Sequence, residues 1–148
     1  MTSQELSDYA KESLTDYIGE RIKSGEDPAD AHRIGTEQMA GLFPQGVPAD
    51  GQLVFCVLDD DDNNVGTLWI GPRTPEQTRH FWVWDIAIDE THRGKGLGRA
   101  TMQLAEAESR SHGATELGLN VFGHNEVARH LYESMGYTTT AVNMRKLF

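Results

Sequence analysis

A seven-residue segment with three alternating glycines, RGKGLGR over residues 93–99, restricts what this chain can form more than any other feature. A β-rich apolar run precedes it over residues 80–88, and a helical pattern follows it over about 98–112. Glycine allows a sharp turn and a close approach of the backbone to a ligand. Successive N–H groups and the positive end of the next helix can then converge on anionic oxygens. The segment predicts a strand–turn–helix unit that binds a diphosphate, with a plain solvent-facing turn as the alternative.

Two other nucleotide-binding motifs do not fit these residues. A Walker loop requires Gly-Lys-Ser/Thr, whereas Arg99 follows the last glycine here. A dinucleotide-binding fingerprint requires G-x-G-x-x-G within a βαβ unit. The spacing here is G-x-G-x-G, and the strands before it are expected to form hairpins. The basic residues of the segment favour an anionic ligand without either motif: Arg93, Lys95 and Arg99.

Apolar periodicity predicts two helices followed by a sheet. Thr2 and Glu5 have capping-box spacing, and Asp27 is followed by Pro28, which is a typical helix start. From about residue 52 the apolar period changes from near four to two. The predicted order is ααβββαβαβ, with helices over 2–24, 27–44, 98–112 and 125–135 and strands over 53–58, 65–70, 80–88, 116–122 and 137–148.

Length and charge limit the class of function. The 148 residues suffice for one domain with a buried core. The net charge is −10, and the acidic excess lies in residues 1–89, whereas residues 90–148 are nearly balanced. A chain this acidic is a poor partner for a nucleic-acid backbone. We expect an anionic ligand in the C-terminal part and a cationic ligand elsewhere.

The numbers and spacing of cysteine and histidine argue against a fold stabilised by disulfide bonds or by a bound metal. Cys56 is the only cysteine, and the six histidines lack metal-binding spacing, so no metal is expected. No apolar run approaches the roughly 20 residues of a membrane helix. The first residues are polar and acidic, without a readable targeting signal. The expectation is a soluble, cytoplasmic protein that does not bind membranes.

Two motifs together resemble the GNAT (Gcn5-related N-acetyltransferase) superfamily. The signature Q/R-x-x-G-x-G/A is matched by Arg93, Gly96 and Gly98. The signature N-x-x-A-x-x-L-Y-x-x-x-G-Y/F is matched further on by Asn125, Ala128, Leu131, Tyr132, Gly136 and Tyr137. The resemblance covers about residues 52–140. It implies an α/β fold of the α+β type, with a mixed, mostly antiparallel central sheet that is splayed in the middle and flanked by helices.

The resemblance also implies a division of labour within one domain, 1–148. Residues 1–50 would form a helical segment on the acceptor side, and residues 52–148 a sheet with the acetyl-CoA-binding core. Family members usually begin with a strand, whereas this chain begins in a helix. An uncovered sheet edge invites pairing with another chain, so a homodimer is an expectation.

Further implications concern the residues that would hold acetyl-CoA as co-substrate. Its diphosphate would lie on the backbone of residues 93–99: Arg93, Gly94, Lys95, Gly96, Leu97, Gly98 and Arg99. Its pantetheine arm would follow Ile86, Ala87 and Ile88 where strand 80–88 splays from strand 116–122. The Ile88 N–H would bind the thioester oxygen. Asn125 would hold the cofactor arm, and Tyr132 would protonate the departing thiolate.

Asp85 is the candidate general base, because an acceptor amine must lose a proton before it attacks. It lies in the middle of a strand among aromatic residues. A structural carboxylate that bonds a nearby loop is an equal alternative. Asp89 and Glu90 are weaker candidates. Strict alternation in this strand would place Trp82, Trp84, Ile86 and Ile88 on one face and Phe81, Val83, Asp85 and Ala87 on the other.

Three functions follow from these residues. The first is an N-acetyltransferase that transfers acetyl from acetyl-CoA to a primary amine by direct attack in a ternary complex, because no nucleophile with a paired base is visible. Its acceptor is a small molecule or a peptide, and the acidic N-terminal part favours a cationic one. The second is a non-catalytic acyl-CoA-binding sensor or interaction module of the same fold. The third is a structural interaction protein whose glycine segment is only a turn.

Overall fold

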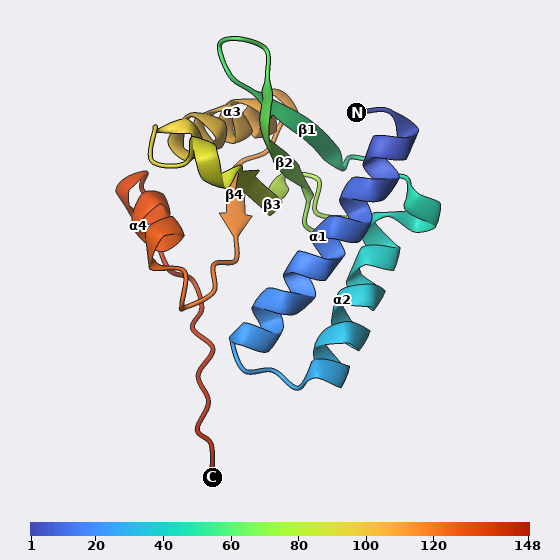
Figure 1. Ribbon diagram of the computed structural model, residues 1–148, viewed down its shortest axis with the longest axis vertical. Helices are drawn as coiled ribbons and strands as arrows, with labels where there is room; N and C mark the ends of the chain where they lie inside the picture. The colour runs from blue at the N-terminus through green and yellow to red at the C-terminus, as the bar shows by residue number, and fades with distance from the viewer.

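The helices and strands follow the predicted order as far as residue 134. The computed structural model describes all 148 residues (Figure 1). Two short 3₁₀ helices, Pro44–Gly46 and Glu90–His92, join the longer elements. The longer elements are α1 (Ser3–Lys23), α2 (Pro28–Leu42), β1 (Leu53–Leu58), β2 (Asn64–Pro72), β3 (His80–Ile88), α3 (Leu97–Ser111), β4 (Glu116–Leu119) and α4 (Glu126–Ser134).

Both N-terminal helices begin where their start signals indicated. The Thr2 hydroxyl accepts a hydrogen bond from the Glu5 N–H, and the Glu5 carboxylate accepts one from the Thr2 N–H. This reciprocal capping box satisfies two N–H groups that the helix cannot pair itself. The Asp27 side chain accepts hydrogen bonds from the N–H groups of Ala29 and Asp30, and Pro28 occupies the first position of α2.

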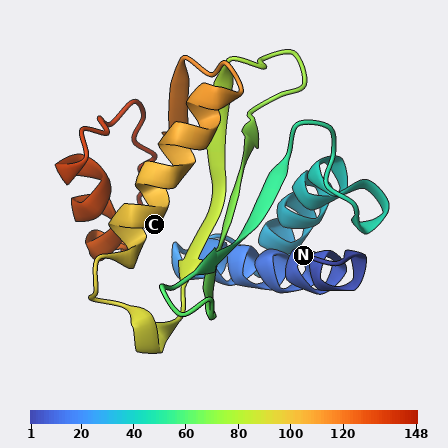
Figure 2. The same ribbon diagram turned by 90° about the horizontal axis from the view of Figure 1, so that it is seen from above.

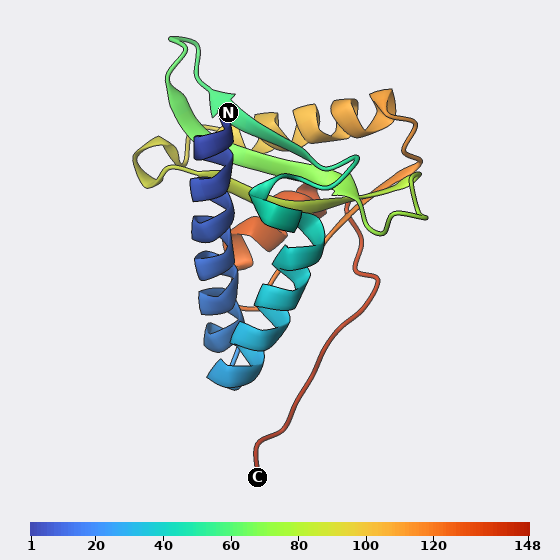
Figure 3. The ribbon, with the colours of Figure 1, turned by 90° about the vertical axis from the view of Figure 1, so that its right-hand side faces the viewer.

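The C-terminal end of the chain departs from the prediction. Residues 137–148 were expected to form a final strand, and residues 138–148 are extended without helix or strand. A strand requires a neighbour for its ladder of hydrogen bonds, and no backbone–backbone hydrogen bond reaches this segment. Figures 1 and 3 show it running away from the body of the protein. Strand β4 is also shorter than the predicted 116–122.

The sheet is mixed and opens on one side. Its strand order is β1-β2-β3-β4, with antiparallel pairs between β1 and β2 and between β2 and β3. Strands β3 and β4 are parallel, and their pairing runs only from His80 opposite Glu116 to Val83 opposite Leu119. Beyond Val83 the two strands separate. The predicted mixed, mostly antiparallel and splayed sheet is therefore confirmed.

Helices cover both faces of the sheet (Figure 2). Helices α1 and α2 lie on one face, where Tyr9, Ala10, Phe43 and Trp69 form a small buried cluster. Helix α3 lies on the other face, and the main core there consists of Leu68, Ile70, Phe81, Val83, Met102 and Ala105. Side chains from both faces of β2 are thus buried, which gives this central strand a nearly continuous buried pattern.

A β-bulge in β3 overturns the predicted alternation of that strand. Trp69 pairs with Asp85 and Ile70 pairs with Val83, so Trp84 has no residue opposite it. An extra residue of this kind shifts the side-chain faces of the strand beyond it. Trp84 packs with the α1 and α2 cluster, whereas Ile86 packs with the α3 core. These two residues were expected on one face and lie on opposite faces. Asp85 likewise lies on the α1 face, opposite to Val83.

The close approach of β2 and β3 predicts a stability change. A Cβ atom at Gly66 would lie 2.2 Å from the Ala87 carbonyl oxygen, which is backbone and cannot rotate away. We expect Gly66→Ala to lower the free energy of unfolding by about 1–3 kcal/mol. At Gly19 in α1 a Cβ would meet nothing, so Gly19→Ala should raise it by about 0.5–1 kcal/mol. Denaturant unfolding of both variants checks the pair, and an unchanged midpoint for Gly66→Ala would contradict this packing.

Candidate active site

The glycine segment forms the turn between β3 and α3. Gly94 and Gly96 have φ angles of 76° and 82°, a region that costs other residues roughly 1–2 kcal/mol. A Cβ atom at either position would meet no other atom within 4 Å. The glycines are therefore required by the backbone conformation, and the space around the turn is open.

The N-terminus of α3 presents unpaired donors at this turn. Gly96 is the N-cap, and no side chain caps the helix. The first backbone bond of α3 runs from the Ala100 N–H to the Gly96 carbonyl, so the N–H groups of residues 97–99 have no acceptor within the protein. Free N–H groups at a helix N-terminus attract anions, and the helix dipole adds to that attraction.

The basic side chains of the segment carry charge that no carboxylate neutralises. The Arg93 Nε donates to the Ile88 carbonyl oxygen at 2.8 Å, which holds the turn against the end of β3. The Arg99 Nη2 donates to the Ser134 hydroxyl of α4 at 2.6 Å. Neither arginine forms an ion pair, and Lys95 has no partner. Three cations and free backbone donors at one turn suit a diphosphate group.

The splayed end of β3 exposes further backbone donors. The Asp89 N–H donates to the Val65 carbonyl oxygen at 2.9 Å, on the β2 side. N–H groups alternate in direction along a strand, so those of Ile88 and Ile86 point to the opposite side. Strand β4 would pair on that side, but its pairing ends at Val83. The backbone of Ile86, Ala87 and Ile88 therefore borders the gap between β3 and β4, with donors available to a ligand.

Helix α4 and its N-cap carry the last two residues that were predicted to act on acetyl-CoA, Tyr132 and Asn125. Asn125 is its N-cap, with Oδ1 accepting a hydrogen bond from the Ala128 N–H at 3.2 Å. Its amide nitrogen keeps its hydrogens free for another acceptor. The Tyr132 ring packs against the main core and against Tyr137. The Tyr132 hydroxyl has no protein partner and is not among the fully buried unpaired atoms, so it reaches solvent. Burial and the charge of Asp85 raise the pKa of Tyr132, which keeps the phenol protonated.

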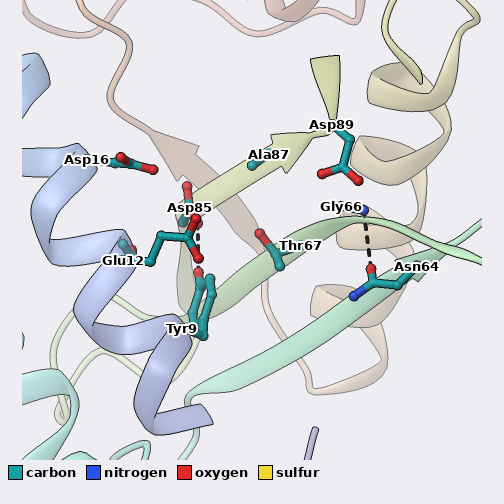
Figure 4. Close-up of a pocket in the computed structure, with 10 residues that line it drawn as sticks. Tyr9, Glu12, Asp16, Asn64, Gly66, Thr67, Asp85, Ala87 and Asp89 are labelled. Carbon is teal, nitrogen blue, oxygen red and sulfur yellow. Dashed lines mark hydrogen bonds between the residues drawn. The ribbon is translucent and has the colours of Figure 1, made fainter. Parts of the chain in front are cut away.

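A pocket of about 250 Å³ lies between α1 and the ends of β2 and β3 (Figure 4). Four of its lining residues are carboxylates and none is basic. Glu12 and Asp16 lie on α1, Asp85 lies on β3, and Asp89 directly follows β3. Uncharged residues complete the lining: Tyr9, Ser13, Asn64, Gly66, Thr67 and Ala87. An acidic cavity of this kind favours a cationic ligand.

Asp85 joins the pocket to helix α1. Its Oδ2 accepts a hydrogen bond from the Tyr9 hydroxyl at 2.7 Å. Burial raises the pKa of Asp85, and the negative charges of Asp16 and Glu12 raise it further. The Tyr9 hydrogen bond acts in the opposite direction because it stabilises the ionised carboxylate. The net effect is a carboxyl group that holds a proton more readily than an ordinary aspartate does.

Helix α1 contributes two carboxylates to this pocket that the sequence pattern did not indicate. In the sequence, Glu12 and Asp16 fall between the apolar positions of the first helix, as the solvent-facing residues of an amphipathic helix do. Their spacing of four residues, which begins at Asp8 and continues to Glu20, does place them in one row along α1. Asp89, a weaker candidate, lines the pocket, whereas Glu90 belongs to the 3₁₀ turn and does not. A row of acidic residues alone does not reveal which surface it faces.

Two further properties of the structure bear on function. No group of three or more His, Cys, Asp or Glu side chains is arranged to hold a metal ion. None of the helices combines the length and the apolar character needed to cross a bilayer.

Known proteins are similar to this chain in sequence and in architecture. The model of the acetyltransferase (GNAT) family matches residues 19–137. Over 147 residues the chain is 29% identical to YycN, described as an uncharacterized N-acetyltransferase of Bacillus subtilis (strain 168), covering 99% of this chain and 94% of YycN. YdgE of the same organism, described in the same way, is 28% identical with the same coverage. The crystal structure of YycN matches with a TM-score of 0.86 at 30% identity, over 100% of this chain and 95% of that one.

The fold, with its splayed sheet beside a glycine-rich turn, is that of an acyltransferase. The chain belongs to the GNAT family of acetyltransferases, as the family model and these relatives show. The resemblance noted from residues 93–98 and 125–137 is thereby confirmed.

The environment of Asp85 predicts opposite pKa shifts in two variants. Tyr9→Phe removes the hydrogen bond that favours the carboxylate, so the pKa of Asp85 should rise. Asp16→Asn removes a repelling negative charge, so the pKa of Asp85 should fall. Carbon-13 NMR of the Asp85 carboxyl carbon across a pH series measures both. Asp61→Asn, in the exposed hairpin between β1 and β2, is the control with no expected shift. A native pKa at or below that of an ordinary aspartate would contradict this description.

Proposed function

We propose that this protein is an acetyl-CoA-dependent N-acetyltransferase that acts on a cationic primary amine by direct attack in a ternary complex. One observation carries the proposal: residues 85–89 border both the splay and the acidic pocket, and the Arg93 bond to the Ile88 carbonyl holds the glycine turn against the end of the same segment. An anionic co-substrate and a cationic acceptor could thus reach the same few backbone atoms from opposite sides of β3.

The residues of the turn and the splay fit acetyl-CoA. The unpaired N–H groups of residues 97–99 and the cations Arg93, Lys95 and Arg99 would hold its diphosphate. The backbone of Ile86 and Ile88 would pair with its extended arm. When bound, the co-substrate supplies an acetyl group activated as a thioester. The Ile88 N–H would stabilise negative charge on the carbonyl oxygen, a contact of about 2.7–4 kcal/mol in comparable sites.

Asp85 supports the removal of a proton from the acceptor. An alkylamine is almost wholly protonated near neutral pH and cannot attack until it is neutral. Asp85 lines the pocket, and its raised pKa brings it closer to that of an effective base. It would take one proton from the ammonium, directly or through one water, before the nitrogen attacks. The nitrogen loses its second proton after the nitrogen–carbon bond has formed, and this proton balances the one that the departing sulfur gains. The neighbouring carboxylates Glu12, Asp16 and Asp89 would hold the acceptor in its cationic form before this step.

Tyr132 would return a proton at the end of the reaction. The carbon–sulfur bond breaks as the nitrogen–carbon bond forms, and the sulfur leaves as a thiolate that needs a proton. The Tyr132 hydroxyl is free of protein partners and is held protonated by its raised pKa. A binding module without chemistry would have less use for an unpaired phenol at this place.

Binding of acetyl-CoA at the turn can be tested by calorimetry. We expect micromolar binding to the wild type and its loss in Gly96→Glu, because a carboxylate would then face the diphosphate. Gly113→Glu is a matched control: Gly113 has the same φ of 82° and equally open surroundings, but lies beyond the other end of α3. Equal binding by both variants would show that the turn does not hold the ligand. No binding by the wild type would overturn the proposal, and binding without release of CoA across an amine library would favour an acyl-CoA sensor.

The role of Tyr132 can be separated from binding. We expect Tyr132→Phe to lower kcat by roughly 10²–10⁴-fold while the Kd for acetyl-CoA stays nearly unchanged. Tyr137→Phe is the control, because Tyr137 packs against Tyr132 but its hydroxyl donates a hydrogen bond to the Glu106 carboxylate. Steady-state kinetics and calorimetry on both variants measure the split. An unchanged kcat in Tyr132→Phe would show that another group protonates the thiolate.

A further inference from the structure

Helix α1 carries two carboxylates without partners, and both line the acidic pocket. Its acidic residues recur at steps of three or four: Glu5, Asp8, Glu12, Asp16 and Glu20. The capping box holds Glu5, and a lysine three residues further on forms an ion pair with each of Asp8 and Glu20. The carboxylates of Glu12 and Asp16 have no hydrogen bond or ion pair with any protein group. These two are the acidic residues of α1 that face the cavity.

The carboxylates of the pocket are spread along it instead of surrounding one point. Figure 4 shows Glu12 and Asp16 on the side of α1, and Asp89 on the other side of Thr67. No three of these side chains are arranged to hold a metal ion. Separated negative charges in a cavity of about 250 Å³ match a ligand whose positive charges are also separated.

The reacting amine alone does not balance these charges. It must be neutral when it attacks, because an ammonium group has no lone pair. An acceptor with a single amine would then leave Glu12 and Asp16 without a counter-charge, although their negative charges already act on Asp85 and raise its pKa. A second amino group that takes no part in the reaction keeps its positive charge near neutral pH and could pair with them throughout.

We propose that the acceptor carries a second cationic amino group, which Glu12 and Asp16 bind while the first amine reacts beside Asp85; this inference rests on the proposed acetyl transfer. Glu12 and Asp16 lie one turn apart on the same face of α1, so both carboxylates can reach one ammonium group. They determine specificity and do not touch the reacting atoms. The cavity is smaller than the roughly 300–1,000 Å³ of pockets for drug-sized molecules, which favours a straight diamine or polyamine over an amine with several rings.

Calorimetry tests the second charge apart from the chemistry. The probes are straight diamines from 1,3-diaminopropane to 1,6-diaminohexane, titrated with and without CoA, which has no acetyl group to transfer. Each is compared with the amino alcohol of the same chain length, in which a neutral hydroxyl replaces one amine. We expect at least one diamine to bind roughly 10–100-fold more tightly than its amino alcohol, and the preference to weaken as salt is added. Equal affinities, or no binding by any diamine, would overturn the proposal.

Variants of α1 test which residues bind the second charge. Glu12→Gln combined with Asp16→Asn should bring the ratio of diamine to amino-alcohol affinity close to one, because both changes remove a negative charge and keep the shape. Asp8→Asn is the matched control, since Asp8 lies one turn earlier on α1, pairs with Lys11 and does not line the pocket. Its ratio should equal that of the wild type, and circular dichroism checks that all variants fold. A preference that survives in the double variant would show that these two residues do not bind the second amine.

Steady-state kinetics separates this proposal from the acetyl transfer on which it rests. With acetyl-CoA, kcat/KM should be higher for the diamine than for its amino alcohol, mainly through KM and beyond the factor of two that two equal amines give. This ratio does not depend on the pKa of Asp85, because both acceptors would use the same base. Equal kcat/KM values would overturn the second cation and leave the acetyl transfer in place. Selective binding of diamines without release of CoA would overturn the acetyl transfer and support the cation-binding role of Glu12 and Asp16.

Discussion

The bulge at Trp84 is the feature on which the rest of the site depends. By leaving one residue of β3 unpaired, it turns Asp85 toward α1 and Ile86 toward α3. A regular strand would place Asp85 on the same face as Phe81 and Val83, in the main apolar core, where a carboxylate is strongly disfavoured. The same region is where β3 and β4 part. One irregularity thus coincides with both an acidic pocket on one face and free N–H donors at the open edge.

Charge is divided between the two sides of this strand end. Carboxylates from α1 and β3 surround the pocket, whereas the turn into α3 carries three cations without carboxylate partners. The division follows the chain, because the acidic excess lies in residues 1–89 and the later residues are nearly balanced. Opposite local potentials a short distance apart would guide two ligands of opposite charge to one segment. They also explain why a low overall pI is compatible with a site for an anion.

Local features were predictable from the sequence, and contacts between distant residues were not. Thr2 with Glu5, Asp27 with Pro28, and the glycines at 94 and 96 act within a few residues, so their patterns located the helices and the turn. The bulge depends on how β2 and β3 pair across the sheet, and strict alternation in residues 80–88 gave no sign of it. The bond between Tyr9 and Asp85 joins residues 76 positions apart. The strand pattern of residues 138–148 likewise indicates a tendency to pair, and no strand of the sheet pairs with them.

Some of the predicted site residues have a structural role that explains their presence, and others do not. Asn125 caps α4, Arg93 bonds the end of β3, and a Cβ at Gly98 would lie 3.4 Å from Leu131 of α4. Each of them supports the fold, so their presence would be expected in a protein that only binds a ligand. Asp85 and Tyr132 differ, because burial disfavours the charged form of the Asp85 carboxyl group and no protein group pairs with the Tyr132 hydroxyl. Groups that the fold does not require are the ones that indicate chemistry. Asp85 lines the pocket, and Tyr132 lies close enough to it for the charge of Asp85 to raise the pKa of the phenol.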